Sequence, residues 1–199
     1  EQQKGKSGLA LRIAATFIRG DAWPDGSPFT GERGAVLWAE SEGALAVNVD
    51  RARKAGLPLE KLIPPLPDAL TEFLIDDAEH MEALRARAMR PDVKLIVLDS
   101  LSGATQGDEN SSSMLHHVKK MAAVAMESGK PVLLLHHLNK GISDGDKIHL
   151  RQVRGSTAIT QTARLVWAID APNEEDAEHR RMYVIKNNLA RFAPDVGFK

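Results

Sequence analysis

Short apolar segments alternate with amphipathic segments along this chain. The apolar segments cover residues 35–40, 94–99, 131–137, 164–170 and 181–187. The second and third are nearly continuous runs of Val, Ile and Leu, which are typical of strands buried on both faces of a parallel sheet. Segments of helical pattern lie between the early ones, at residues 43–55, 70–89 and 110–128. This alternation predicts an α/β fold with a mainly parallel sheet, right-handed crossovers and helices on both faces.

The last two apolar segments follow a different pattern. Only a short, polar and acidic connection at residues 171–179 separates them, so we expect an antiparallel hairpin at one edge of the sheet. Segments rich in glycine, proline or charge predict irregular structure at residues 20–34, 56–67 and 140–154. We predict a single domain over residues 1–199, since this length suits one hydrophobic core.

The first residues carry a phosphate-binding motif. Residues 1–7 (EQQKGKS) match the last seven positions of G-x-x-x-x-G-K-[ST]. In this motif backbone N–H groups and a helix N-terminus cradle the phosphates, Lys6 reaches the β- and γ-phosphates, and the Ser7 hydroxyl ligates Mg²⁺. Lys4, Gly5 and Gly8 complete the predicted nucleotide contacts.

The surroundings of this motif also bear on its assignment. Residues 8–18 have apolar side chains at helical spacing, as the helix that follows a phosphate-binding loop requires. Such a loop also needs a preceding strand, so we expect a core whose first strand is missing at the N-terminus, in a chain that begins within the loop. Because glycine-lysine-serine also occurs in ordinary loops, the assignment depends on the rest of the chain.

The composition limits the classes of function. The chain has 43% hydrophobic and 27% charged residues, a formal net charge of −1 and no cysteine. Without cysteine there are no disulfides, thiolate nucleophiles or Cys-based zinc sites. The near-neutral charge excludes nucleic-acid binding by bulk charge, so such a contact needs a local loop or an assembled ring. No apolar run reaches the roughly 18 residues of a membrane helix and no signal peptide is visible, so we expect a cytoplasmic protein that binds no membrane.

Residues 93–100 (VKLIVLDS) form a second nucleotide-binding signal. A buried strand that ends in an aspartate is the Walker B pattern, in which the carboxylate emerges beside the phosphates and holds Mg²⁺ directly or through water. Taken alone, Asp99 would more often cap the following turn. Together with the first motif, it predicts a nucleotide site in which Ser7 and Asp99 are the metal ligands.

A family resemblance begins at the end of the first apolar segment. Residues 38–45 (WAESEGAL) resemble the strand end of RecA-like recombinases and hexameric helicases, where a glutamate activates the hydrolytic water. The resemblance implies that Glu42 is this general base, with Glu40 as the near alternative. Simple P-loop kinases and GTPases usually lack this glutamate. Without a catalytic role, both acidic residues would simply begin a solvent-exposed helix.

The resemblance continues at residues 135–140 (LHHLNK). They are similar to the His-His motif of the RepA-type replicative helicases, where a polar sensor contacts the γ-phosphate, and the similarity implies this role for His137. A histidine pair can also suggest a metal site, but adjacent residues of a strand point to opposite faces. A second pair, His116 and His117, is interpreted as part of a solvated helix face.

A further stretch, residues 153–167 (VRGSTAITQTARLVW), resembles the R-G-S-x-A-L-x-x-x-x-R segment of the same group. There the second arginine projects into the ATP of the neighbouring subunit as an arginine finger, and the resemblance gives this role to Arg164. The alternative is an arginine that flanks a strand and pairs with a carboxylate. Lys186 matches a lysine of the family's K-x-N pattern near the subunit boundary, and the resemblance adds it to the predicted nucleotide contacts. The match is loose, because Leu189 and Ala190 replace the usual Tyr-Gly.

Two loops are candidates for contact with DNA, because the corresponding loops of RecA-like proteins face a central channel. Residues 103–113 are acidic rather than basic. Residues 140–154 carry basic side chains that suit several phosphate contacts per subunit, namely Lys140, Lys147, His149, Arg151 and Arg154. Neither loop has an aromatic residue for base stacking, and a plain connection is an equally good interpretation.

Together the ordered motifs imply a three-layer RecA-like P-loop core that binds and hydrolyses ATP with Mg²⁺. The resemblance implies a ring-forming DNA motor of the RepA- or DnaB-like helicase type, assembled as a homo-oligomer, a hexamer by analogy, with single-stranded DNA as a partner. One alternative is a RecA- or KaiC-like ATPase of recombination or regulation. Another is a P-loop small-molecule kinase, which would need an Arg-rich lid and an acceptor pocket.

Overall fold

The structure is a computed structural model that describes residues 5–105, 113–138, 147–153, 157–173 and 178–199. Its α-helices are α1 (Lys6–Arg19), α2 (Leu45–Lys54), α3 (Ala78–Ala88), α4 (Ser113–Ser128) and α5 (Thr157–Thr162). Its strands are β1 (Ala35–Glu40), β2 (Leu62–Ile63), β3 (Val93–Asp99), β4 (Val132–Leu134), β5 (Leu165–Asp170), β6 (Arg180–Asn187) and β7 (Val196–Phe198). Short 3₁₀ helices cover Leu59–Lys61 and Leu150–Gln152. Within these ranges, no helix combines the length and the apolar character that crossing a bilayer requires.

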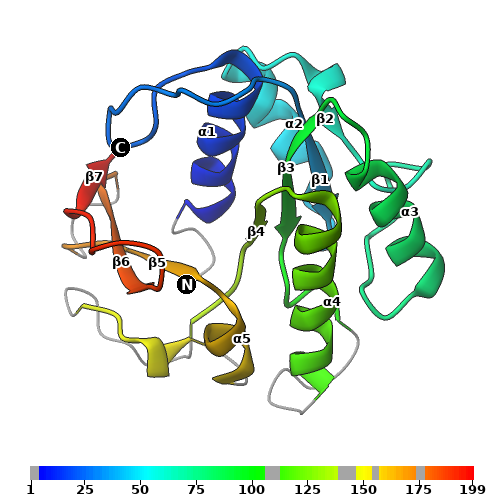
Figure 1. The fold of residues 1–199 in the computed structure, drawn as a ribbon. Helices are drawn as coiled ribbons and strands as arrows, with labels where there is room; N and C mark the ends of the chain where they lie inside the picture. Colours follow the sequence, from blue (N-terminus) through cyan, green and yellow to red (C-terminus); the bar gives the residue numbers. More distant parts are fainter. Residues whose placement is uncertain (1–4, 106–112, 139–146, 154–156, 174–177) are drawn as a thin grey trace.

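Four strands form a parallel sheet in the order β2-β1-β3-β4. β1 and β3 pair along their whole length, and the pairing places Glu40 opposite Asp99 at their carboxyl ends. All six residues of β1 are buried, as expected of a strand that is covered on both faces. Helices α1 and α2 lie on one face of the sheet and α3 and α4 on the other (Figure 1). The prediction of a mainly parallel, three-layer α/β core is confirmed.

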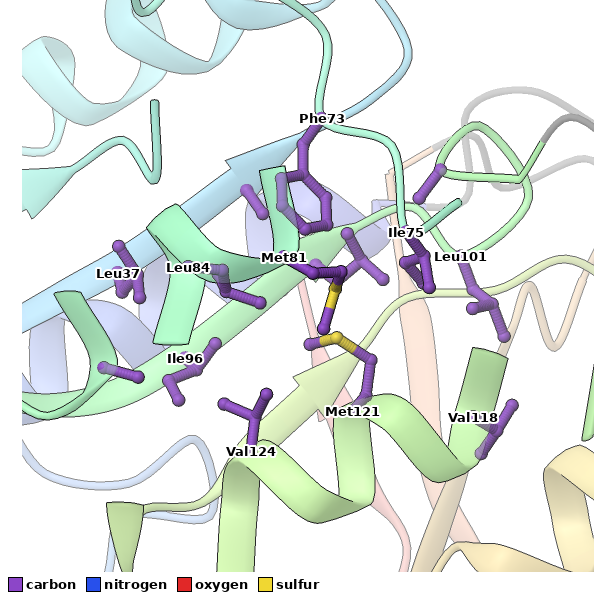
Figure 2. Packing of buried hydrophobic residues seen from close by; sticks show 14 of the residues in the cluster. Leu37, Phe73, Ile75, Met81, Leu84, Ile96, Leu101, Val118, Met121 and Val124 are labelled. Atoms are coloured by element: carbon purple, nitrogen blue, oxygen red, sulfur yellow. The ribbon is translucent and has the colours of Figure 1, made fainter. Parts of the chain in front are cut away.

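Alternate residues of the central strands enter two separate hydrophobic cores. On β1, Leu37 packs with α3 and α4, whereas Val36 and Trp38 pack with α1. Figure 2 shows the first of these cores, in which Met81 from α3 and Met121 from α4 lie side by side next to the strands. This period of two is the side-chain alternation of a β-strand, and it explains why the strand reads as a continuous apolar run.

The remaining strands form a second sheet, antiparallel and ordered β5-β6-β7. The predicted hairpin is therefore present as β5 and β6, but its position at an edge of the parallel sheet was wrong. Within the described residues β5 pairs only with β6, and β4 pairs only with β3. The third strand, β7, lies in a short segment that the apolar pattern does not distinguish. Figure 1 shows this sheet on the opposite side of α1 from β1 and β3.

The helix predicted over residues 70–89 begins only at Ala78. Asp77 caps its start, because the Asp77 side chain accepts hydrogen bonds from the backbone N–H groups of Glu79 and His80. Residues before the cap are not helical: Phe73 N donates to Glu40 O at 2.8 Å, and Ile75 N donates to Ala104 O at 2.8 Å. Both side chains are fully buried in the first core, so tertiary packing outweighs the helical pattern here.

Candidate nucleotide-binding site

The N-terminus of α1 has the geometry of an anion-binding site. Gly5 precedes the helix with φ 80°, a left-handed conformation that favours glycine, and α1 starts at Lys6. The first turn contains no acidic residue, so its N–H groups and the helix dipole favour a phosphate. Gly8 is exposed, and a Cβ there would meet no atom within 4 Å. Lys4 lies outside the described residues.

Three predicted side chains form a connected chain next to this helix end. Lys6 Nζ lies 3.5 Å from His137 Nδ1, and His137 Nε2 lies 3.1 Å from Glu42 Oε1. Each residue comes from a different part of the fold: Lys6 begins α1, Glu42 follows β1, and His137 follows β4. The strand β4 ends at Leu134, earlier than the sequence predicted. The carboxyl ends of parallel strands thus bring together residues that are up to 131 positions apart.

The two candidate glutamates have different environments. Glu40 is buried, and its Oε1 accepts hydrogen bonds from the backbone N–H groups of Glu42 at 2.9 Å and Ala44 at 3.0 Å. Its carboxylate therefore closes the turn after β1. The Glu42 carboxylate instead meets His137 and the Ser100 hydroxyl, and its side chain is 38% exposed. Of the two, only Glu42 lies on the side of Lys6 and has access to solvent.

The surroundings of Glu42 keep it ionised. Burial opposes the charge, but hydrogen bonds from Ser100 and His137, together with the positive charge of Lys6, outweigh it, so the pKa of Glu42 is lowered. An ionised carboxylate can accept a proton, as a general base must. The geometry and the charge state both suit that role.

Ser7 and Asp99 lie together, as the two motifs predicted. The Ser7 hydroxyl donates a hydrogen bond to Asp99, and Asn48 Nδ2 donates to Asp99 Oδ2 at 3.2 Å. Burial raises the pKa of Asp99, and the nearby negative charges of Glu42 and Glu40 raise it further. A cation beside this carboxylate would relieve that cost, and Mg²⁺ prefers oxygen ligands such as these two. The residues present therefore fit a Mg²⁺ ion shared with a nucleotide.

His136 and His117 lie outside the contacts between Lys6, His137 and Glu42 and have other partners. His136 Nδ1 lies 3.2 Å from Ser102 Oγ, so the two adjacent histidines contact different groups. In the second pair, His116 is exposed, but His117 is buried and its Nε2 lies 2.5 Å from Asp76 Oδ1. The interpretation of this pair as a solvated helix face was therefore wrong for His117. Among the described residues, no group of three or more His, Asp or Glu side chains is arranged to hold a metal.

Arg164 and Lys186 lie at the end of the antiparallel sheet. Arg164 immediately precedes β5 and is exposed, and in the described part of the chain its guanidinium has no hydrogen bond or ion pair. The alternative role of an arginine paired to a carboxylate is not seen within these residues. Lys186 Nζ donates to the carbonyl oxygens of Thr160 at 2.6 Å, Gln161 at 3.2 Å and Ala163 at 2.7 Å. Lys186 therefore holds the C-terminal end of α5, directly before Arg164.

Replacing Lys186 with methionine should destabilise the fold. The change leaves three carbonyl oxygens at the end of α5 without their donor, so we expect the free energy of unfolding to fall by about 1–3 kcal/mol. Denaturant unfolding would measure it. Lys199→Met is the control, because Lys199 pairs with Glu178 at the surface, where both side chains are 64% exposed and such a pair contributes little stability. Equal effects of the two substitutions would contradict the holding role of Lys186.

Of the basic loop at residues 140–154, the structure describes residues 147–153, and Lys140 and Arg154 lie outside the described residues. Lys147 Nζ donates to Asp195 Oδ2 at 2.9 Å and lies 5.4 Å from the centre of the Tyr183 ring. The Tyr183 hydroxyl in turn accepts a hydrogen bond from Ile148 N, and burial raises the pKa of Tyr183 to about 12. Lys147 thus fastens the loop to the second sheet, which leaves it less suited to a phosphate contact.

Sequence reasoning did not identify two polar residues of the site. Asn48 is buried on α2 and donates a hydrogen bond to Asp99. The sequence signal that could have identified it is its position four residues before Ala52, which places both residues on the buried face of the helix. Ser100 follows the Walker B aspartate and binds Glu42. A small polar residue at the end of a strand has no pattern of its own, so only the structure reveals this contact.

Known proteins resemble this chain along most of its length. The family model described as an AAA domain matches residues 1–143. A solved structure of an ATPase domain superposes with a TM-score of 0.70 at 13% identity, covering 99% of this chain and 78% of that one. The crystal structure of the RadB recombinase gives a TM-score of 0.62 at 15% identity, covering 98% and 82%. The chain therefore belongs to the AAA domain family and has the fold of a RecA-like P-loop ATPase core.

Proposed function

We propose that this chain is the ATP-binding and hydrolysing core of a ring-forming motor that acts on DNA. The contact chain from Lys6 through His137 to Glu42 is the observation that carries this proposal. It joins a phosphate-binding cation, a polar sensor and an ionised base at the carboxyl end of a parallel sheet, where ligands of such folds bind.

In the proposed reaction, the Lys6 ammonium and the N–H groups of α1 bind the β- and γ-phosphates. Glu42 orients a water molecule and accepts its proton while the water oxygen forms a bond to the γ-phosphorus. The bond from the γ-phosphorus to the bridging oxygen breaks, and ADP leaves with the electron pair. His137 contacts both Lys6 and Glu42, so it can register the presence of the γ-phosphate between them.

Ser7 and Asp99 are the residues that would hold Mg²⁺. When bound, this ion neutralises charge on the β- and γ-phosphate oxygens. Asn48 keeps the Asp99 carboxylate turned toward Ser7 by its hydrogen bond at 3.2 Å. These oxygens lie beside the start of α1, so one site can serve the metal and the phosphates together.

The finer part of the proposal concerns assembly and DNA. An exposed Arg164 without an ion pair among the described residues is available to a neighbouring subunit, as a trans-acting finger requires. The basic loop of residues 140–154 is the candidate surface for single-stranded DNA, through its residues other than Lys147. A recombination or regulatory ATPase without helicase activity is the alternative proposal, and the similarity in fold to the RadB recombinase does not decide between the two.

ATP turnover with and without single-stranded DNA tests the proposal. We expect Mg²⁺-dependent release of phosphate from ATP, and we expect DNA to stimulate this release. In a DNA motor, binding of DNA to the surface loops changes the rate of hydrolysis at the nucleotide site. The Lys6→Ala variant is the control, since it lacks the ammonium that binds the phosphates. Turnover that DNA leaves unchanged would favour a regulatory ATPase, whereas transfer of the γ-phosphate to a small molecule would indicate a kinase and reject the proposal.

A further inference from the structure

Ser100 forms a direct contact with the proposed general base. Its hydroxyl donates a hydrogen bond to Glu42 Oε1, the same oxygen that His137 Nε2 contacts at 3.1 Å. Ser100 itself is 1% exposed, so water does not compete for its hydroxyl. Hydrogen bonds from a buried donor to an ionised acceptor are among the stronger ones in proteins.

The backbone around Ser100 is fitted closely to the turn that carries Glu42. Ser41 Oγ donates to Ser100 O at 2.7 Å and Ser100 Oγ donates to Glu42, so each of the two turns donates one serine hydroxyl to the other. At Gly103 a Cβ would lie 2.1 Å from Ser41 O and 2.9 Å from Glu42 Cγ. Only glycine allows this approach, and it holds the turn after β3 against the turn after β1.

We propose that Ser100 is a positioning residue that holds the Glu42 carboxylate toward Lys6 and His137. This inference rests on the proposed function, in which Glu42 accepts the proton of the attacking water. Glu42 is partly exposed and lies on a turn, so its side chain would otherwise occupy several rotamers. Fixing it in one orientation places the base where the water must stand, and misplaced groups lower the rate without lowering affinity.

A double-mutant cycle on the full protein tests this role. Ser100→Ala should lower kcat by about 10- to 100-fold, the value of one hydrogen bond to a charged group. The affinity for a non-hydrolysable ATP analogue should stay unchanged, because the Ser100 hydroxyl donates to Glu42 and the residues assigned to phosphate binding are unaltered. In a Glu42→Gln background, Ser100→Ala should have little further effect, since the group that it positions has already lost its function.

Ser102→Ala is the matched control, because this serine lies in the same turn after β3 but its hydroxyl lies 3.2 Å from His136 Nδ1 instead of contacting the Glu42 carboxylate. Its effect on kcat should be the same in both backgrounds, and Ser100→Thr should restore turnover by restoring the hydroxyl. Equal losses from Ser100→Ala in both backgrounds would overturn the positioning role. If Glu42→Gln itself leaves turnover unchanged, the general base was assigned wrongly, which is a failure of the proposed function instead.

Discussion

Replacing Arg164 with alanine is expected to lower the ATPase rate of the assembled protein by about 10³–10⁵-fold, the contribution of arginine fingers in phosphoryl transfer. The guanidinium is exposed before β5 and makes no contact with the Lys6 site of its own chain among the described residues. In the proposed ring it would therefore act on the nucleotide site of a neighbouring subunit. ATP affinity should stay unchanged, and the activity of the wild-type protein should rise with its concentration as rings form.

Mixing two inactive variants tests the trans-acting role directly. Subunits with Arg164→Ala retain an intact phosphate-binding loop, whereas subunits with Lys6→Ala retain an intact finger. At some interfaces of a mixed ring, the intact phosphate-binding loop of one subunit then faces the intact arginine finger of the next. Partial activity should therefore return. If mixed assembly is established and no activity returns, Arg164 is not a trans-acting finger.

Replacing Glu42 with glutamine is expected to lower turnover by about 10²–10⁴-fold while ATP stays bound, because the amide cannot accept a proton. The substitution keeps the size of the side chain and an oxygen that can accept from Ser100 and His137. Phosphate release under saturating ATP measures the loss, and equilibrium binding of ATP measures the affinity.

Glu40→Gln is the control for this substitution. The Glu40 carboxylate accepts two backbone hydrogen bonds, at 2.9 and 3.0 Å, and a glutamine oxygen can accept both. We therefore expect a small effect on turnover. If Glu40→Gln abolished turnover and Glu42→Gln did not, the base would be assigned two residues too late in the sequence.

The elements that the sequence predicted well are those that are buried along most of their length. Every residue of β1 is buried, as is every residue of β3 but one, and α1 buries seven of the eight residues from Leu9 to Thr16, so their apolar patterns follow their geometry. β2 is only two residues long and lies in a proline-rich segment that predicted irregular structure. α5, with six residues, is too short to show a period. Segments of this length are fixed by pairing and packing with distant residues, which a local pattern does not contain.

The candidate site divides in the same way. Lys6, Ser7 and Asp99 belong to motifs with fixed spacing along the chain, so the sequence predicted that they would lie together. The resemblance favoured Glu42 over Glu40 as the general base. The structure adds a physical difference between them that residue type does not contain, since the Glu40 carboxylate accepts two backbone hydrogen bonds and the Glu42 carboxylate meets Ser100 and His137. The contact of Ser100 with Glu42 joins residues 58 positions apart and had no signal in the sequence.

The register of β1 and β3, which places Glu40 opposite Asp99, determines where the protein can tolerate insertions and deletions. A shift of one residue in β1 or β3 would exchange the side chains that enter the two cores and would move Glu42 away from Ser100. Insertions in these strands should therefore abolish both folding and turnover. The exposed turn at residues 25–27 lies outside this pairing, so the same insertion there should be tolerated. Variation in length among related chains should accordingly concentrate in that connection and spare the two central strands.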